Sequence, residues 1–349
     1  MKVLYISGWH STLEHDELNV LTHLGHTWFS TGLYADPDNP IKEGYWRESE
    51  LTQKVDTKVL SEFRKLNPDL KPYKPLNLSK EFVDQFDLVM VVYCGLLDME
   101  FFNVWPHIKH KPVIWRTYAQ QSPKNEQMVS SLVDKGNVTI VRVSETETRL
   151  PNSAGMDFAV MGYVDENKYK KWSGSKHNVL TFNNFFSRRS YVSNTPLYRR
   201  IRTRMHDYSF SLYGGYNEDV DICLGRLDSN EQVKAYKDCG VYFALGSKPA
   251  ALTYNLQEAT MTGCPIVTFG EKLGSSRPSL YAVPDMFENG TEMFMGDTEE
   301  ELVFFIKTLL DTPDVAKAMS KAVRKKALEL YSKESIIKQW GEVIDCAVE

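Results

Sequence analysis

The stretch ALTYNLQEATMTGCPIVTFG, residues 251–270, predicts a short helix, a glycine stop and then a buried strand. The apolar positions of the expected helix are Leu252, Leu256, Ala259 and Met261. Gly263 is placed to end this helix, and the apolar run 266–269 has the composition of a central parallel strand. One acid, Glu258, stands in the middle of the helix, and its presence so close to a buried strand suggests a function.

Length and composition favour a globular chain of two domains. With 349 residues the chain is long for a single core, and its net charge of −5 disfavours non-specific coating of nucleic acid, which draws on a basic excess. Five cysteines without a C-x-x-C spacing predict buried, reduced thiols and a cytoplasmic location. No apolar stretch approaches the roughly 20 residues of a membrane span, so no integral membrane segment is expected.

Strand and helix patterns alternate along the chain in two series. The first series has expected strands at 3–6, 27–34, 87–93, 111–118 and 137–144, and a helix at 13–24. The second series has expected strands at 179–184, 208–215 and 240–246, and helices at 197–206 and 229–239. Each series is typical of a doubly wound α/β domain with a parallel sheet.

The polar segment KWSGSKHN at 171–178 is the expected domain boundary. The predicted domains are an N-terminal domain at 1–172, a C-terminal domain at 173–330 and a final helix at 331–349. Residues 36–80 are rich in Pro, Lys, Asp and Asn and are interpreted as an insertion with one amphipathic helix near 50–66. The periodicity of the tail from residue 312 predicts helix throughout.

Ligands of open α/β sheets lie outside the carboxyl ends of the strands, so the loops after strands are the candidate sites. Asn183 opens the loop after the first strand of the second series, and Arg188 and Arg189 follow in the same loop. Paired guanidinium groups suit a diphosphate, although a solvated basic loop has the same composition. Gly214 follows the next strand, where glycine permits close backbone approach or forms a plain turn.

A second candidate loop follows the strand at 240–246. Ser247, Thr253, Tyr254 and Asn255 lie in this loop and in the first turn of the helix, whose free N–H groups favour phosphate. Glu258, one turn further along, has a carboxylate that could accept two hydrogen bonds from a ribose diol. A solvent-facing glutamate is the alternative interpretation of Glu258 considered alone.

The spacing of these segments resembles the second domain of the two-domain GT-B glycosyltransferases, above all the retaining family of sucrose-synthase-like and cell-surface-glycan transferases. The matching segments are VLTFNNFFSRRS, LDSNEQVKAYKDCGVYFALGS and NLQEATMTGCPIVTFG, the last corresponding to the family's LEAMACGTPVI. The resemblance implies an α/β chain of two facing Rossmann-like domains with a cleft between them. It also implies a hinge near residue 172 and a C-terminal helix that crosses back to the first domain.

The resemblance further implies transfer of a sugar from a nucleotide-diphosphate sugar, with a UDP-sugar expected, to an acceptor hydroxyl without a metal or other cofactor. Glu258 would bind the ribose, Arg188 or Arg189 would neutralise the diphosphate, and the backbone of 253–256 would face the phosphates or the sugar. The family usually carries two glutamates eight positions apart, the first of them near the donor sugar, and that earlier position here is Ala250. The sugar-reading half of the motif is therefore missing or rebuilt.

The first domain is expected to supply the acceptor side. His10, Glu14, His15 and Asp16 lie just after the first strand and are candidates for the base that takes the acceptor proton. The alternative is that they are surface polar residues of a helix's first turn, where acids favour the helix dipole. Arg116 and Tyr118, at the end of another strand, are also placed on the acceptor side.

Three further observations leave alternatives open. The triplet DVD at 219–221 matches the metal-binding D-x-D of the other glycosyltransferase fold, but its place between strands favours turn residues and no metal site. The segment 188–204 holds six arginines, which keeps open a bacteriophage-type glycosyltransferase that modifies hydroxymethylated bases in DNA. Ala250 keeps open a non-catalytic protein that binds a nucleotide or a sugar.

Overall fold

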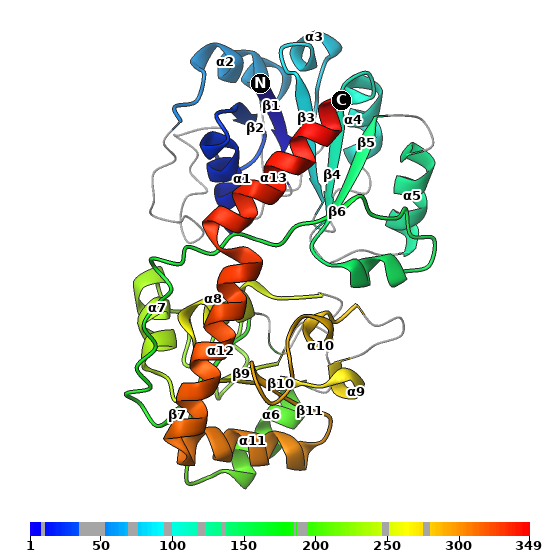
Figure 1. Ribbon diagram of the computed structural model, residues 1–349. Coiled ribbons are helices and arrows are strands. Elements are labelled where there is room, and N and C mark those ends of the chain that lie inside the picture. Colours follow the sequence, from blue (N-terminus) through cyan, green and yellow to red (C-terminus); the bar gives the residue numbers. More distant parts are fainter. Residues whose placement is uncertain are drawn as a thin grey trace. The chain divides into compact units, whose positions relative to one another are not determined.

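The structure is a computed structural model that divides into two compact units, each built on its own parallel sheet (Figure 1). Unit 1 comprises Met1–Tyr163 together with Ile336–Glu349, and unit 2 comprises Val164–Ser335. Residue 172, the expected boundary, lies within unit 2. The described residues are 1–7, 11–34, 53–68, 76–93, 100–117, 123–133, 137–184, 186, 194–245, 251–274 and 280–349.

Unit 1 contains a sheet with the strand order β2-β1-β3-β4-β5-β6, and every neighbouring pair is parallel. The strands are β1 Lys2–Ile6, β2 Thr27–Ser30, β3 Leu88–Tyr93, β4 Val113–Thr117, β5 Val138–Arg142 and β6 Phe158–Ala159. The helices are α1 Ser11–His23, α2 Thr57–Leu66, α3 Lys80–Val83, α4 Glu100–Ile108, α5 Pro123–Val133 and the 3₁₀ helix η2 Glu145–Arg149.

Unit 2 contains a sheet with the strand order β11-β10-β9-β7-β8, also parallel throughout. The strands are β7 Asn178–Phe182, β8 Ser209–Tyr213, β9 Val241–Ala244, β10 Ile266–Phe269 and β11 Phe294–Gly296. The helices are α6 Asn194–Arg204, α7 Ser229–Asp238, α8 Tyr254–Thr262, α9 Glu271–Gly274, α10 Val283–Met286, α11 Glu299–Asp311 and α12 Pro313–Tyr331, followed by α13 Lys333–Val348, which runs into unit 1.

The α/β class and the parallel sheets expected from the sequence are confirmed, with one clear difference in the tail. Uninterrupted helix was expected from residue 312, but α12 ends at Tyr331 and Ser332 has extended backbone angles. The Ser332 hydroxyl then accepts a hydrogen bond from the backbone N–H of Ser335, as an N-cap serine does. The cysteines also differ: Cys239 and Cys264 are buried free thiols as expected, whereas Cys346 is exposed.

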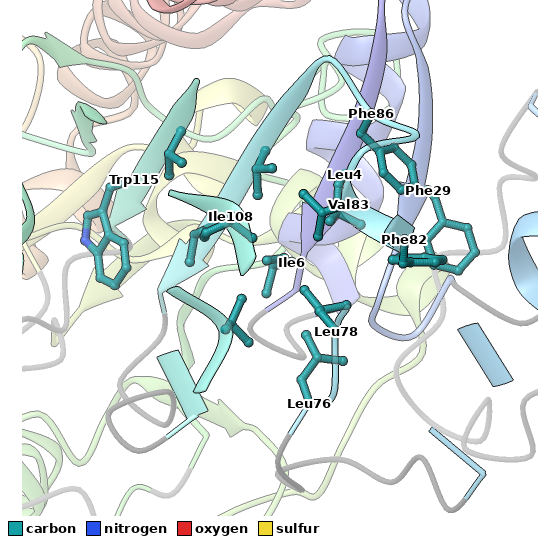
Figure 2. Packing of buried hydrophobic residues seen from close by; sticks show 14 of the residues in the cluster. Leu4, Ile6, Phe29, Leu76, Leu78, Phe82, Val83, Phe86, Ile108 and Trp115 are labelled. Atoms are coloured by element: carbon teal, nitrogen blue, oxygen red, sulfur yellow. The ribbon is translucent and has the colours of Figure 1, made fainter. Parts of the chain in front are cut away.

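One face of the unit 1 sheet is covered by buried residues of α2 to α5. Because alternate residues of a strand share a face, Leu4 and Ile6 of β1 lie in one cluster with buried residues of α2 to α5. Figure 2 shows Phe29, Phe82 and Phe86 close together in this cluster, with Trp115 at its far side. The Phe29 ring lies 5.2 Å from the Phe63 ring and 5.8 Å from the Phe82 ring. This aromatic group ties α2 and α3 to β2.

No helix in the described part of the chain is long and apolar enough to cross a membrane.

We expect Phe29→Ala to destabilise unit 1 by about 3–5 kcal/mol, because it removes a ring that is 2% exposed and packs against the rings of Phe63, Phe82 and Phe86. Urea unfolding followed by circular dichroism measures the loss. The matched control is Phe304→Ala, since the Phe304 side chain is 64% exposed and its removal leaves no cavity. Equal losses for the two variants would contradict the packing described here.

Candidate functional site

The strand order of unit 2 reverses at β7, which has β8 on one side and β9 on the other. In open parallel sheets such a switch point is where ligands bind, outside the carboxyl ends of the strands. β7 ends at Phe182 and β8 at Tyr213, so Asn183 and Gly214 are the next residues of the chain. Two residues predicted for the donor site therefore lie directly at the switch point.

Asn183 and Gly214 contact one another closely. The backbone N–H of Asn183 donates to the carbonyl of Tyr213 at 2.9 Å, which continues the pairing of β7 with β8 by one residue. A Cβ atom on Gly214 would lie 2.1 Å from the carbonyl oxygen of Asn183, so a side chain does not fit there. The fold itself therefore requires glycine at position 214, and the role of Gly214 in ligand binding stays a prediction.

Asn217 fixes the start of the loop that follows β7, and sequence reasoning missed it. Its Nδ2 donates to the carbonyl of Asn183 at 2.7 Å, and its Oδ1 accepts from the N–H of Phe186 at 2.6 Å. The Asn217 side chain thus spans both ends of the 183–186 segment. An asparagine four residues after a strand carries no local signal for this role, because its partners lie more than thirty positions away.

The first turn of α8 reaches the same end of β7. Thr253 is the N-cap, with extended backbone angles, and its hydroxyl accepts from the N–H of Leu256. Asn255 Nδ2 donates to the carbonyl of Phe182, the last residue of β7, at 3.3 Å. Gly263 ends the helix with φ +85°, as its place in the sequence predicted. The candidate donor residues Asn183, Gly214 and Asn255 are therefore brought together at one edge of the sheet.

Glu258 is 6% exposed, so its carboxylate is held by protein groups and does not face open solvent. Tyr169 Oη donates to Oε1 at 2.7 Å, and Gln232 Nε2 donates to Oε2 at 2.8 Å. The hydroxyl of Tyr236 lies 3.3 Å from Oε2 and 3.1 Å from the carbonyl of Asn255. The solvent-facing interpretation of Glu258 is thereby corrected. Sequence reasoning missed all three partners, which lie 22 to 89 positions away.

Several predicted residues lie outside the described residues: His10, Tyr118, Arg188, Arg189 and Ser247. Their roles stay predictions. Ala250 lies there as well. Of the other candidates in the 251–255 segment, Thr253 and Tyr254 are half-buried at the start of α8.

Glu14, a candidate base, is buried in unit 1 and is surrounded by hydrogen-bond donors. Its two oxygens accept from the hydroxyls of Ser7 and Ser30, each at 2.5 Å, and from the N–H groups of Leu33 and Tyr34 at 3.1 and 3.0 Å. Burial raises the pKa of Glu14 above its ordinary value of 4.5, and the hydrogen bonds oppose the rise. The alternative of surface polar residues is wrong here, because the Glu14 side chain joins the ends of β1 and β2.

His15 and Asp16 are likewise buried, and they contact one another. His15 Nδ1 lies 3.1 Å from Asp16 Oδ1, and the His15 ring lies 5.7 Å from the ring of Tyr34. The base role predicted for this pair stays a prediction.

Arg116 was placed on the acceptor side and proves to be fully buried. Its Nε donates to Glu17 Oε1 at 2.9 Å, and Tyr5 Oη donates to the other oxygen of Glu17 at 2.8 Å. The Arg116 guanidinium also lies over the Trp340 ring, 5.4 Å from its centre. Burial raises the pKa of Glu17, and the charge of Arg116 opposes that rise. Arg116 therefore links β4, α1 and α13 within unit 1.

Three described arginines of the 188–204 segment make ion pairs with acids of unit 2. Arg199 pairs with Asp221, and Arg200 pairs with Glu299 at 2.7 Å. Arg204 pairs with Glu300 at 2.8 Å. The second aspartate of the DVD triplet is thus an exposed ion-pair partner. Within the described parts of the chain, no three His, Cys, Asp or Glu side chains gather as a metal site would require.

Comparison with known proteins agrees with this architecture. A family model described as "Glycosyl transferase-like" matches residues 188–342. The HepE protein of Anabaena, solved with UDP and glucose, is 13% identical, with 99% of each chain covered and a TM-score of 0.66. Sucrose-phosphate synthase of Thermosynechococcus elongatus is 13% identical over 99% of this chain and 98% of that one, also with a TM-score of 0.66. No curated protein matches the sequence.

A glycosyltransferase from Rickettsia africae shares the fold as well, with 11% identity, coverage of 100% of this chain and 98% of that chain, and a TM-score of 0.67. Residues 188–342 therefore form a glycosyl transferase-like domain, and the chain has the fold of the GT-B glycosyltransferases. The expected enzyme class is confirmed for the segment that the family model matches: residues 188–342 are glycosyl transferase-like.

We expect Glu14→Gln to destabilise unit 1 by about 1–3 kcal/mol at pH 5, because the new amide group would face backbone N–H donors. The sign of the pH dependence follows from the raised pKa. The stabilising contribution of Glu14 is fully present below its unfolded-state pKa, for which the ordinary value is 4.5, and is lost as the pH rises through the folded-state pKa. The difference in unfolding free energy between wild type and Glu14→Gln, measured by urea unfolding, should therefore become smaller from pH 5 to pH 8.

The matched control for this prediction is Glu342→Gln, which changes an exposed glutamate of the same unit. The unfolding free energy of Glu342→Gln should differ little from that of wild type at both pH values. A Glu14→Gln gap that widens as the pH rises would show that the four donors, and not burial, dominate the ionisation of Glu14.

Proposed function

We propose that the protein transfers a sugar from a nucleoside-diphosphate sugar, with a UDP-sugar as the expected donor, to an acceptor hydroxyl. The main observation behind this proposal is that Asn183, Gly214 and Asn255 lie together at the switch point of the unit 2 sheet. The matched family segment covers most of this unit. The solved HepE structures, which hold UDP or UDP-glucose, support the choice of donor.

In this proposal the donor lies against unit 2. The N-terminal end of α8, whose dipole favours an anion, faces the diphosphate beside Asn183 and Gly214. Arg188 and Arg189 neutralise the phosphate charge, as the resemblance implies. Glu258, on the second turn of the same helix, accepts a hydrogen bond from a ribose hydroxyl.

During transfer the bond between the sugar's anomeric carbon and the diphosphate oxygen breaks, and a bond to the acceptor oxygen forms. The diphosphate leaves with the bonding electrons, and the proton of the acceptor hydroxyl passes to a base on the acceptor side. Donors that are already oriented toward the diphosphate stabilise this developing charge without reorganising, which is the main source of rate enhancement in such sites. We propose that these groups replace a metal ion in the reaction, with unit 1 supplying the acceptor side.

Binding of nucleoside diphosphates tests the donor assignment. We expect UDP and UDP-glucose to raise the thermal unfolding midpoint, and Glu258→Gln to weaken UDP binding about 10- to 100-fold, the range for hydrogen bonds to charged groups. Isothermal titration gives the affinities, with ADP, GDP and CDP run in parallel. Glu329→Gln, on an exposed face of α12, is the matched control.

Two outcomes would overturn parts of this proposal. Absence of binding by every nucleoside diphosphate would remove the donor assignment. Binding without turnover of any nucleotide sugar would favour the alternative of a non-catalytic nucleotide-binding protein.

A pair of neighbouring glycines gives a sharper test of the switch point. We expect Gly214→Ala to weaken UDP binding tenfold or more and to lower stability by about 1–3 kcal/mol, since its Cβ would displace the Asn183 carbonyl. Gly215→Ala is the control, because the nearest atom to its added Cβ lies 3.8 Å away and the methyl fits. Equal UDP affinities for the two variants would place the donor elsewhere.

A further inference from the structure

The orientation of Glu258 is set by groups from three separate segments of unit 2. Tyr169 lies near the start of the unit, Gln232 lies on α7, and Glu258 itself lies on α8. Each oxygen of the carboxylate has its own side-chain donor: the Tyr169 hydroxyl at Oε1 and the Gln232 amide at Oε2. Both contacts are short, at 2.7 and 2.8 Å, so the plane of the carboxylate is fixed from two sides.

Tyr169 is itself held in place by its backbone. Its N–H donates to the carbonyl of Asp165 at 2.9 Å, which closes a turn. Its carbonyl accepts from Arg324 Nη1 at 2.7 Å, and the same nitrogen donates to the carbonyl of Met261 on α8. One guanidinium therefore connects the Tyr169 segment to the helix that carries Glu258. These backbone contacts hold Tyr169 in the position from which its hydroxyl donates to the carboxylate.

Gln232 is anchored in a similar way. Its amide nitrogen carries two protons, and it lies 2.8 Å from Glu258 Oε2 and 3.4 Å from the Tyr236 hydroxyl. Tyr236 is fully buried, and its ring lies 6.2 Å from the ring of Tyr169. Tyr236 thus contacts both donors of Glu258: its ring lies near the ring of Tyr169, and its hydroxyl lies near the Gln232 amide. These contacts restrict the positions that the carboxylate can take.

We propose that Tyr169 and Gln232 are positioning residues for nucleotide recognition, because they hold the Glu258 carboxylate in the orientation that accepts a ribose hydroxyl. This inference rests on the proposed function. Their effect is one of preorganisation: without them, of the three partners described here only the longer contact with the Tyr236 hydroxyl, at 3.3 Å, orients the carboxylate, and ordering it is an added cost of binding. The expected signature is a loss of discrimination between ribose and deoxyribose, beyond any general loss of affinity.

The experiment measures the affinities of UDP and 2′-deoxy-UDP by isothermal titration. Wild type should prefer UDP by about tenfold or more, the effect of one hydrogen bond to a charged group. Tyr169→Phe keeps the ring and removes only the hydroxyl, so the preference for UDP over 2′-deoxy-UDP should fall at least threefold. The unfolding midpoint should fall as well, because a buried carboxylate loses one donor, and the ratio of the two affinities separates the positioning role from this loss of stability. Gln232→Leu, at a half-buried position, should reduce the same preference and gives the answer independently of how Tyr169→Phe folds.

Tyr208→Phe is the matched control. The Tyr208 hydroxyl also donates to a carboxylate in unit 2, Asp311 Oδ2, and also at 2.7 Å. Because that pair is exposed, its loss should leave the preference for UDP unchanged. In a Glu258→Gln background the Tyr169→Phe change should have no further effect on the preference, since a positioning residue acts only through the group that it holds.

The possible failures separate the two proposals. If wild type binds UDP and 2′-deoxy-UDP equally, or binds neither, the ribose assignment of Glu258 fails. If wild type discriminates while Tyr169→Phe and Gln232→Leu discriminate equally well, the assignment of Glu258 stands and the positioning roles are overturned. An additive effect of Tyr169→Phe in the Glu258→Gln background would also overturn them.

Discussion

The buried carboxylate of Glu258 constrains much of unit 2. A charge removed from water costs several kcal/mol unless hydrogen bonds replace its hydration, so each oxygen needs donors with good geometry. The donors come from the start of the unit and from α7, which must therefore lie against α8 in one arrangement. The same helix begins with the turn that reaches the end of β7. The position of α8 therefore does two things: it brings Glu258 to its hydrogen-bond donors, and it places Asn255 at the end of β7.

Unit 1 uses the same chemistry near the ends of its first strands. Glu14 and Glu17 are three positions apart on α1, yet they serve different partners: Glu14 accepts from hydroxyl and backbone donors, and Glu17 pairs with Arg116. Both carboxylates are buried, and both have raised pKa values because burial outweighs their partners. Loss of Arg116 or of the donors around Glu14 would leave a buried carboxylate without its ion pair or hydrogen bonds. This part of α1 is therefore intolerant of substitution.

The sequence predicts well whatever depends on local pattern. Apolar runs mark the parallel strands, because both faces of such strands are buried, and Gly263 marks the end of α8. Strand ends then predict that Asn183 and Gly214 come together, since neighbouring parallel strands finish at one edge. Partners that depend on packing between distant segments carry no local signal. Tyr169 is 89 positions from Glu258, and Glu14 has the pattern of an exposed acid in a helix's first turn until Ser30 and the 33–34 backbone are brought to it.

The contacts of Arg324 have a consequence for the order in which the protein forms during synthesis. This arginine joins carbonyls of Glu166, Tyr169 and Met261, and it lies 155 positions beyond Tyr169. Unit 1 likewise includes Trp340, whose ring covers Arg116 more than two hundred positions earlier. Chain ends that must return to early segments lengthen the loops to be closed, which slows folding. Unit 1 therefore cannot be completed until Ile336–Glu349 has been made, whereas unit 2 is one continuous stretch that holds all the partners of Arg324.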